Sequence, residues 1–347
     1  MDLHREGFGR RAPRQEVEDF LGEIFFGHPW LDETLPSLGY VDATGQLVGC
    51  LGVMPRPMVL DGRPVRAVVT HNFVVTPGHR AGLAAIQLMR SLMACGPDLT
   101  LADGNETARG ISEALGGTTV LPRSGRWLRV LRPAGLALHM LDVWHEGWRL
   151  PHYVNRALSG LSAGPDAVAR TFPGSPIYVR TVEGPDAELD EGMLLSLIER
   201  YTRHLSLRPA YVAGDLAWMF GMLRKTRRDQ GLRARVVLEA GDEVGWYVYY
   251  SRPGQVGRVL QMGAGPLAQG RVLDHLFADA VHEGNVGLSG QSDPAWSVSL
   301  DGAGCRARAG STWLLVYTSH PRIEQALGGS EAFLSRLEGE AWLHFGF

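Results

Sequence analysis

The sequence predicts an α+β protein of two tandem domains, each a mixed and mostly antiparallel sheet flanked by helices. Three observations carry this prediction. With 347 residues the chain exceeds the ordinary size of one compact core, at roughly 150 residues per domain. In the first half, an antiparallel meander leads into alternating strands and helices. A similar order of elements returns in the second half.

Composition and charge fit a folded protein and exclude several partners. Hydrophobic residues make up 45% of the chain and charged residues 20%, which is too apolar for disorder. A net charge of -3 provides no basic field for a nucleic-acid backbone. No apolar run approaches the roughly 20 residues of a membrane span, and no signal-like segment is visible. We therefore expect a cytoplasmic protein without a membrane span.

Cysteine and histidine usage points away from disulfides and metals. Cys50, Cys95 and Cys305 are widely spaced and odd in number, which excludes a disulfide framework. Neither they nor the 12 histidines have the spacing of a metal site, so we expect no metal.

Apolar periodicity assigns the elements of the first half. Residues 15–26 repeat apolar side chains at helical spacing and predict an amphipathic helix. Runs of β-branched residues broken by turns predict strands at 38–42, 47–54, 57–60 and 65–75. The alternating part is predicted as helices 82–93 and 106–115 and strands 99–102, 118–121 and 127–131.

Proline and glycine clusters place a domain boundary between residues 133 and 176. We expect an N-terminal domain at 1–135, a linker region at 136–176 and a C-terminal domain at 177–347. The elements predicted after the boundary are helices 191–203, 213–228 and 267–282 and strands 234–238, 244–250, 258–262, 286–288 and 313–318.

The segment from Val74 to Ala84 carries most of the chemistry. A β-branched strand ends at Pro77, and a turn of small residues leads into a helix. Glycine and alanine let the backbone approach a ligand closely, and the first-turn amides of a helix suit a diphosphate. His79 and Arg80 add positive charge. The alternative is an ordinary strand-to-helix connection, which the spacing alone does not exclude.

This segment resembles motif A of the GCN5-related N-acyltransferases (GNAT), whose backbone amides hold the pyrophosphate of an acyl-CoA. The family pattern is Arg or Gln, two residues, Gly, one residue, and then Gly or Ala. His79, Gly82 and Ala84 occupy the three positions, with Arg80 beside the first. The resemblance implies acetyl-CoA or another acyl-CoA as co-substrate.

Residues 99–116 resemble motif B of the same family, a strand followed by Asn and a helix that closes in a Leu-Gly pair. The resemblance implies that Asn105 contacts the pantetheine arm, while its chemistry equally suits the N-cap of the helix 106–115. By resemblance, the coenzyme contacts are Phe73, Val74, Val75, His79, Arg80, Ala81, Gly82, Leu83, Ala84, Asn105 and Ala108.

Candidate catalytic residues follow from the same resemblance. Many GNAT enzymes carry on the second helix a tyrosine that protonates the departing thiolate, and Ser112 stands at that position, although serine is a poor acid. His71 and Asn72 lie on the strand that splays in this fold to admit the thioester. They are a candidate base and a candidate contact to the acyl carbonyl, with a structural role as the alternative. Glu338, in the segment Glu338-Gly339-Glu340, is a candidate carboxylate base, with a solvated turn before a final buried strand as the alternative.

The second half resembles a degenerate GNAT domain. Gly263-Ala264-Gly265-Pro266 stands in place of the cradle, and no basic residue accompanies it. We expect this half to shape the acceptor site and not to bind a second CoA. Asp293, which precedes a proline, is more typical of a turn or cap than of a catalytic base.

These features predict an N-acyltransferase that moves an acetyl or short acyl group from CoA to an amine by direct attack. By analogy alone, the acceptor is a small molecule or an amino sugar. The alternative is a GNAT-fold protein that has lost the chemistry and serves as a ligand-binding or scaffold protein. Ser112 favours this alternative, and the retained cradle opposes it.

Overall fold

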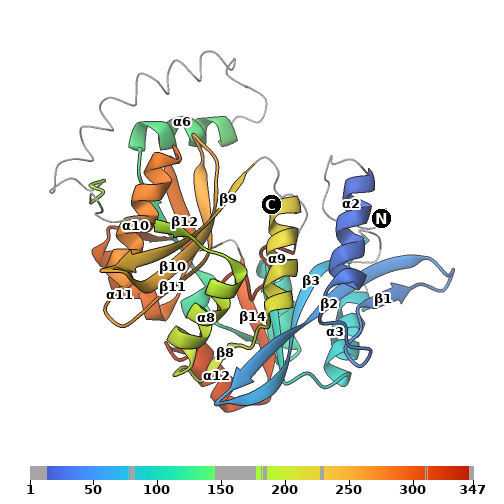
Figure 1. Cartoon of the computed structure of the whole chain (residues 1–347). Coiled ribbons are helices and arrows are strands. Elements are labelled where there is room, and N and C mark those ends of the chain that lie inside the picture. Colours follow the sequence, from blue (N-terminus) through green and yellow to red (C-terminus); the bar gives the residue numbers. More distant parts are fainter. Residues whose placement is uncertain are drawn as a thin grey trace. The chain divides into compact units, whose positions relative to one another are not determined.

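The computed structural model divides into two compact units (Figure 1). It describes residues 14–76, 78, 83–144, 177–180, 182, 186–226, 230–308, 310 and 312–343. The first unit comprises Met1–Ser124, Thr202–Arg227 and Gly310–Phe347, and the second comprises Gly125–Tyr201 and Arg228–Ala309. Each unit is therefore assembled from segments that are separated in the sequence.

The first unit contains a mixed sheet with the strand order β1-β2-β3-β4-β14-β5, and β8 pairs with β2. Its strands are β1 (Leu38–Val41), β2 (Leu47–Leu60), β3 (Arg63–Val75), β4 (Leu99–Gly104), β5 (Thr118–Thr119), β8 (Leu207–Pro209) and β14 (Trp313–Thr318). Only β3 and β4 run parallel, and the other described pairs are antiparallel. The predicted α+β class is confirmed in this unit.

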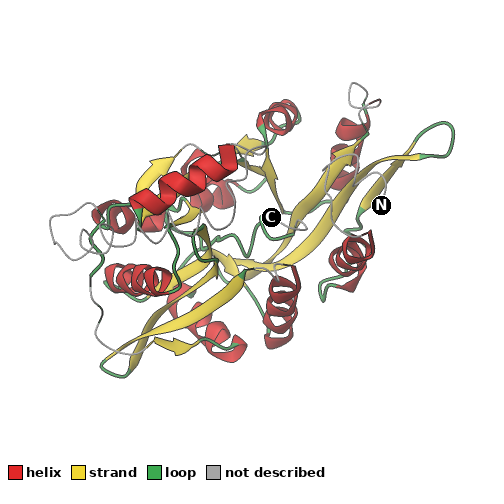
Figure 2. Cartoon of the chain, turned by 90° about the horizontal axis from the view of Figure 1, so that it is seen from above, coloured by secondary structure: helices red, strands yellow, loops and turns green. Residues whose placement is uncertain are grey.

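Helices lie on both faces of the first sheet, as Figure 2 shows. They are α2 (Arg14–Gly22), the π-helical turn η1 (Glu23–Gly27), α3 (Ala84–Ala94), α4 (Glu106–Ala114), α5 (Leu121–Ser124), α9 (Ala213–Thr226) and α12 (Pro321–Gly328). From α3, Leu88 and Leu92 pack with Leu51 and Val68 of the sheet in an apolar core. This amphipathic packing stabilises the helix that follows β3.

The second unit contains a sheet with the order β13-β6-β12-β11-β10-β9-β7. Its strands are β6 (Arg126–Val130), β7 (Asp186–Glu188), β9 (Gly231–Glu239), β10 (Asp242–Ser251), β11 (Val256–Ala264), β12 (Gly287–Gln291) and β13 (Arg306–Arg308). Its helices are α6 (Pro133–Trp144), α8 (Glu191–Thr202), α10 (Gln269–His282), η3 (Pro294–Trp296) and α11 (Ser297–Gly302). Again one described pair, β11 with β12, is parallel. Tyr247 and Tyr249 pack with Leu276 in the core.

The units differ from the contiguous ranges 1–135 and 177–347 because three strands pair outside their own stretch of sequence. One of them is β8, which pairs with β2 in the first sheet. β6 pairs with β12 in the second sheet, and β14 pairs with β4 in the first. The residues predicted as a strand at 57–60 belong to the long β2, and α6 begins before the predicted linker. Among the described residues, no helix combines the length and apolar character needed to cross a membrane.

A buried arginine ties the C-terminal part of the chain to the first unit. Arg123, 1% exposed, donates to the carbonyl oxygens of Leu327 at 2.8 Å, Ala332 at 2.9 Å and Gly329 at 3.1 Å. These carbonyls lie at and just after the end of α12, where a helix leaves its last acceptors without intrahelical donors. The buried guanidinium therefore caps the C-terminal end of α12.

A second buried arginine lies within a group that we call the Arg56 cluster: Arg56, His28, Trp30, Tyr211, Trp218 and Trp342. The Arg56 guanidinium carbon lies 4.3 Å from the centre of the Trp30 ring and 5.7 Å from that of Trp342. Burial, and secondarily the positive charge of Arg56, lowers the pKa of His28 to about 4. His28 is therefore neutral at physiological pH.

We expect Arg123→Met to lower the free energy of unfolding by about 3 kcal/mol, because it leaves buried carbonyls without donors. Urea denaturation monitored by circular dichroism measures the change. Arg63→Met replaces an exposed arginine of the same unit and should change stability by no more than about 0.5 kcal/mol. Equal effects of the two substitutions would contradict the role assigned to Arg123.

The pKa of His28 predicts a pH dependence of stability. The unfolded chain binds this proton near pH 6.5 and the folded chain near pH 4, so the stabilisation is complete above pH 6.5 and is lost as the pH falls toward 4. We expect His28→Phe to reduce the loss of unfolding free energy between these values by on the order of 2 kcal/mol. Urea titrations at several pH values measure it, and parallel curves for both proteins would contradict it.

Candidate functional site

The two parallel strands of the first sheet separate part of the way along their length. β3 pairs with β4 only from Ala67 to Val69, opposite Leu99 to Leu101. β3 then continues to Val75 on its partner β2, and β4 continues to Gly104 on its partner β14. Beyond these residues, β3 and β4 no longer pair with each other.

A β-bulge marks the place where the strands separate. The register between β2 and β3 shifts between the pairs Cys50–Val74 and Gly52–His71, which leaves one extra residue on β3. Asn72 lies there with a φ of 48°, a left-handed conformation that costs a non-glycine residue energy. Bulges bend a strand and re-aim its side chains, which accounts for the departure of β3 from β4.

The C-terminal segment bridges the separated strands. Glu340 accepts a hydrogen bond from the backbone N–H of Asp103 on β4 at 2.9 Å. The side-chain amide of Asn72 on β3 donates to the carbonyl oxygen of Leu343 at 2.9 Å. A turn closed by the Leu343 N–H and the Glu340 carbonyl, also at 2.9 Å, links the two contacts. The segment therefore contacts both edges of the opening.

His71 is held within the protein at this position. Its side chain is fully buried, the Asn72 amide lies 3.0 Å from its Nδ1, and its ring meets the Phe25 ring edge-on at 4.8 Å. A Cβ at Gly52 would lie 2.4 Å from the His71 ring, so glycine makes room for it. These contacts fit the structural alternative for His71, while its role as a base stays a prediction.

The helix after β3 begins without a side-chain cap. Leu83 is its N-cap residue and is largely exposed, and no described side chain accepts from its first amides. Ala84, at the first helical position, is buried. Uncapped first-turn amides are what anion binding requires. His79, Arg80, Ala81 and Gly82 lie outside the described residues, so their coenzyme contacts stay predictions, as do those of Phe73, Val74 and Val75 on β3.

Asn105 is the N-cap of α4. Its Oδ1 accepts a hydrogen bond from the backbone N–H of Ala108 at 3.0 Å, and its backbone is extended. The capping alternative is therefore confirmed. The side chain is exposed, and contact of Asn105 and Ala108 with a coenzyme stays a prediction.

A tyrosine lies beside the serine at the family's acid position. Ser112 is 3% exposed on α4, and a Cβ at Gly117 would lie 2.4 Å from the Ser112 Oγ and 2.9 Å from the Cζ of Tyr317. Burial raises the pKa of Tyr317; the Ser112 hydroxyl is close enough to oppose this, without the geometry of a hydrogen bond. Tyr317 therefore retains its proton at neutral pH. No sequence motif points to Tyr317, because it lies on β14, far along the chain from α4.

The two glutamates near the C-terminus have different environments. Glu338 is 1% exposed and accepts hydrogen bonds from the Tyr211 hydroxyl at 2.8 Å and from the Ser335 N–H at 2.7 Å. Glu340 instead contacts β4 at the opening between the strands. The predicted solvated turn is wrong, since both carboxylates are buried, and Glu340 is the one beside the separated strands.

The second unit repeats the separation of parallel strands. β11 pairs with β12 only from Val256 to Arg258. The helix α10 follows β11 without a side-chain cap, and Leu267 before it is fully exposed with a φ of 64°.

Asp293 accepts from the Ala295 N–H, which confirms its predicted capping role.

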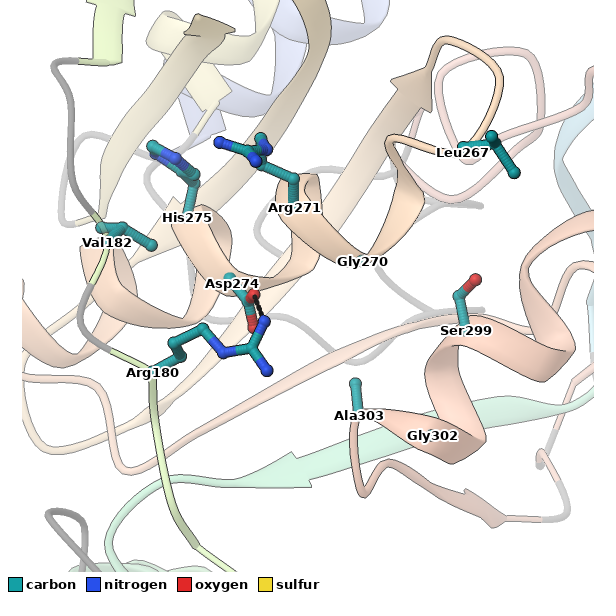
Figure 3. A pocket seen from close by; sticks show the side chains of 10 residues that line it. All are labelled: Arg180, Val182, Leu267, Gly270, Arg271, Asp274, His275, Ser299, Gly302 and Ala303. Carbon is teal, nitrogen blue, oxygen red and sulfur yellow. Dashed lines mark hydrogen bonds and ion pairs between the residues drawn. The ribbon is translucent and has the colours of Figure 1, made fainter. Parts of the chain in front are cut away.

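A cavity of about 540 Å³ lies beside α10 and α11 (Figure 3). Arg180 and Arg271 line it. Arg180 pairs with Asp274 at 3.2 Å, and Arg271 pairs with Glu239. Each positive charge therefore already has a partner.

Comparison with known proteins identifies the architecture. No protein-family model matches the sequence, and no curated protein is similar to it in sequence. Among solved structures, Saccharomyces cerevisiae N-myristoyltransferase with bound myristoyl-CoA is similar, at 14% identity and a TM-score of 0.56, over 96% of this chain and 81% of that one.

Two further structures have the same arrangement. A GCN5-related N-acetyltransferase from Anabaena variabilis matches with a TM-score of 0.58 at 9% identity, over 92% of this chain and 69% of that one. A probable N-acyltransferase of unknown function from Enterococcus faecalis matches with a TM-score of 0.55 at 11% identity, over 91% and 68%. The chain therefore has a GNAT-like fold, with two mixed sheets flanked by helices.

Proposed function

We propose that this protein is an acyl-CoA-dependent N-acyltransferase whose first unit binds the coenzyme. The observation that supports it most is the separation of β3 from β4 at the bulge of Asn72, followed directly by a helix without a cap. A strand edge and uncapped amides together offer hydrogen-bond donors to a pantetheine arm and a diphosphate.

The likeness to an enzyme solved with myristoyl-CoA supports an acyl-CoA as co-substrate. Transfer of the acyl group to an amine by direct attack requires a base for the amine proton and an acid for the thiolate. We assign the acid to Tyr317, which stays protonated beside the family's acid position, and a base role to Glu340, whose carboxylate lies at the opening. An acetyl or short acyl group, a small-molecule or amino-sugar acceptor and a cytoplasmic location stay predictions from the sequence.

The second candidate function is a GNAT-fold protein that binds an acyl-CoA without transferring its acyl group. Ser112 at the acid position and the complete burial of His71 favour it. The two candidates agree on coenzyme binding and differ in thiol release.

We expect acetyl-CoA or a longer acyl-CoA to raise the melting temperature. At 100 times Kd the stabilisation is about 2.7 kcal/mol, which corresponds to several degrees. Arg80→Ala should reduce this shift, because it removes a charge next to the proposed diphosphate position. Arg90→Ala, an exposed arginine further along on α3, is the control and should leave it unchanged. No shift with any acyl-CoA would contradict coenzyme binding.

We expect Tyr317→Phe to lower kcat by about 10²-fold with an amine that accepts the acyl group, because it removes the proton donor. The melting shift with acyl-CoA should not change. Thiol release, followed with a thiol-reactive dye, measures the rate. Ser112→Ala is the matched variant and should have a smaller effect. A larger loss with Ser112→Ala would reverse the assignment, and no thiol release across a broad amine panel would support the binding protein.

A further inference from the structure

Polar atoms without hydrogen-bond partners gather in the Arg56 cluster of the first unit. Within the part of the chain that the structure describes, Arg56 Nη1, His28 Nδ1, Trp30 Nε1 and Trp218 Nε1 are buried and have no partner. Arg56 and His28 are each only 3% exposed. Leaving a buried polar group unpaired costs free energy, so four in one place indicate that the site normally holds an occupant.

Three of these four atoms belong to aromatic rings that lie next to one another, and the fourth belongs to the guanidinium beside them. The Trp30 and Trp218 rings meet edge-on at 5.5 Å, and the His28 ring lies 6.2 Å from Trp30 and 6.4 Å from Trp218. The Arg56 guanidinium lies over Trp30 at 4.3 Å. The unpaired atoms therefore belong to one group of neighbouring side chains rich in aromatic rings.

The positive charge of Arg56 in this cluster is not balanced by a direct ion pair. Arg56 Nη2 donates to the Tyr211 hydroxyl at 2.8 Å and to the Leu337 carbonyl oxygen. Among the described residues, no carboxylate lies within ion-pair distance of the guanidinium. Glu338 is one hydroxyl away, on the far side of Tyr211. The Nη1 side of Arg56 thus presents a buried positive charge that has no direct counterion.

The unpaired groups specify the chemistry of the occupant. Arg56 Nη1 and the two indole nitrogens are donors only, so the occupant accepts hydrogen bonds. His28 is neutral, and Glu338 already places a carboxyl group on the far side of Tyr211, so Arg56 can compensate at most one added negative charge. A planar monoanion, a carboxylate, fits three donors and aromatic walls better than a phosphate dianion, which would leave a second charge buried.

The C-terminal segment connects the Arg56 cluster to the opening between β3 and β4. Leu337 and Trp342 contact Arg56, and Leu343 contacts Asn72. Along the paired strands, Arg56 lies opposite Ala67 and Gly52 opposite His71, a separation of about 13 Å at 3.3 Å per residue. Trp30 and Trp218 are only half-buried and form the side of the cluster nearest to solvent.

We propose that the Arg56 cluster binds a carboxylate group of the acceptor substrate, an inference that rests on the acyltransferase function proposed above. The acceptor is then an amine that also carries a distant carboxylate, such as a short peptide with a free C-terminus, whose N-terminal amine can lie about 13 Å from the carboxylate. Arg56 and the two indoles fix the carboxylate, and the amine extends toward the separated strands.

The binding test uses protein labelled with ¹⁵N at tryptophan indoles, titrated with acetate and N-acetylglycine and, separately, with acetamide and N-acetylglycinamide. The carboxylates should shift the Trp30 and Trp218 indole resonances saturably, and the amides should not. Trp30→Phe and Trp218→Phe assign the two signals. Equal shifts with the amides, or none with either series, would overturn the proposal and leave a structural water as the occupant.

Arg56→Met should weaken carboxylate binding at least about tenfold, while Arg56→Lys retains part of it because it keeps the charge. Arg63→Met is the matched control and should bind as the wild type does. Should Arg56→Met fail to fold, the wild-type titration and Trp218→Phe still decide the question, since Trp218→Phe removes one donor from a half-buried position.

The melting shift with acyl-CoA separates this proposal from the proposed function. A carboxylate response without an acyl-CoA shift would leave the binding site in place and overturn its role in acyl transfer. An acyl-CoA shift without a carboxylate response would overturn the carboxylate site alone. With a short-peptide acceptor, Arg56→Met should raise KM about tenfold or more with little change in kcat, whereas a KM equal to that of wild type would contradict the role in acceptor binding.

Discussion

The end of pairing between β3 and β4 is the constraint on which the candidate site depends. If β3 and β4 paired along their whole length, no opening would exist between them next to the helix that follows β3. The bulge at Asn72 prevents this, because between the flanking pairs β3 has one residue more than β2 and therefore bends. Because Asn72 adopts a strained conformation, neighbouring contacts must hold it, and its hydrogen bond to Leu343 is one of them. The opening and the C-terminal segment therefore depend on each other.

Buried polar side chains provide that mutual support in the first unit. Arg123 binds the end of α12, Arg56 binds Leu337, and Glu340 binds the backbone of β4. Each contact joins the C-terminal stretch to a strand or helix from the first 125 residues of the chain. Hydrophobic packing alone sets few distances, whereas hydrogen bonds to a charged group have a fixed direction and length. The position of the segment at the opening follows from these bonds.

Local properties of the sequence predicted most helices and strands. They could not predict which strands from distant parts of the chain pair with each other. Periodicity located α3, α4, β3 and β14, because each pattern is read within one short window. The capping role of Asn105 is likewise local. By contrast, β6 and β14 pair with strands that are far away in the sequence. Tyr317 reaches the site only through such pairing, and no motif near it marked it. The segment Glu338-Gly339-Glu340 was a candidate from the sequence, but only the C-terminal contacts show that Glu340 is the carboxylate at the opening.

The two units share the same arrangement of separated parallel strands and differ in whether their arginines are paired with carboxylates. In each, a parallel pair separates after three residues and is followed by a helix without a side-chain cap. In the second unit, Arg180 and Arg271 face Asp274 and Glu239, so a ligand anion would have to displace an existing carboxylate. In the first, Arg56 has no carboxylate within ion-pair distance among the described residues. An anion gains most where the protein has left a cation unpaired, because there it replaces a desolvation cost with an ion pair. The same fold can thus have an anion site in one unit and a self-neutralised surface in the other.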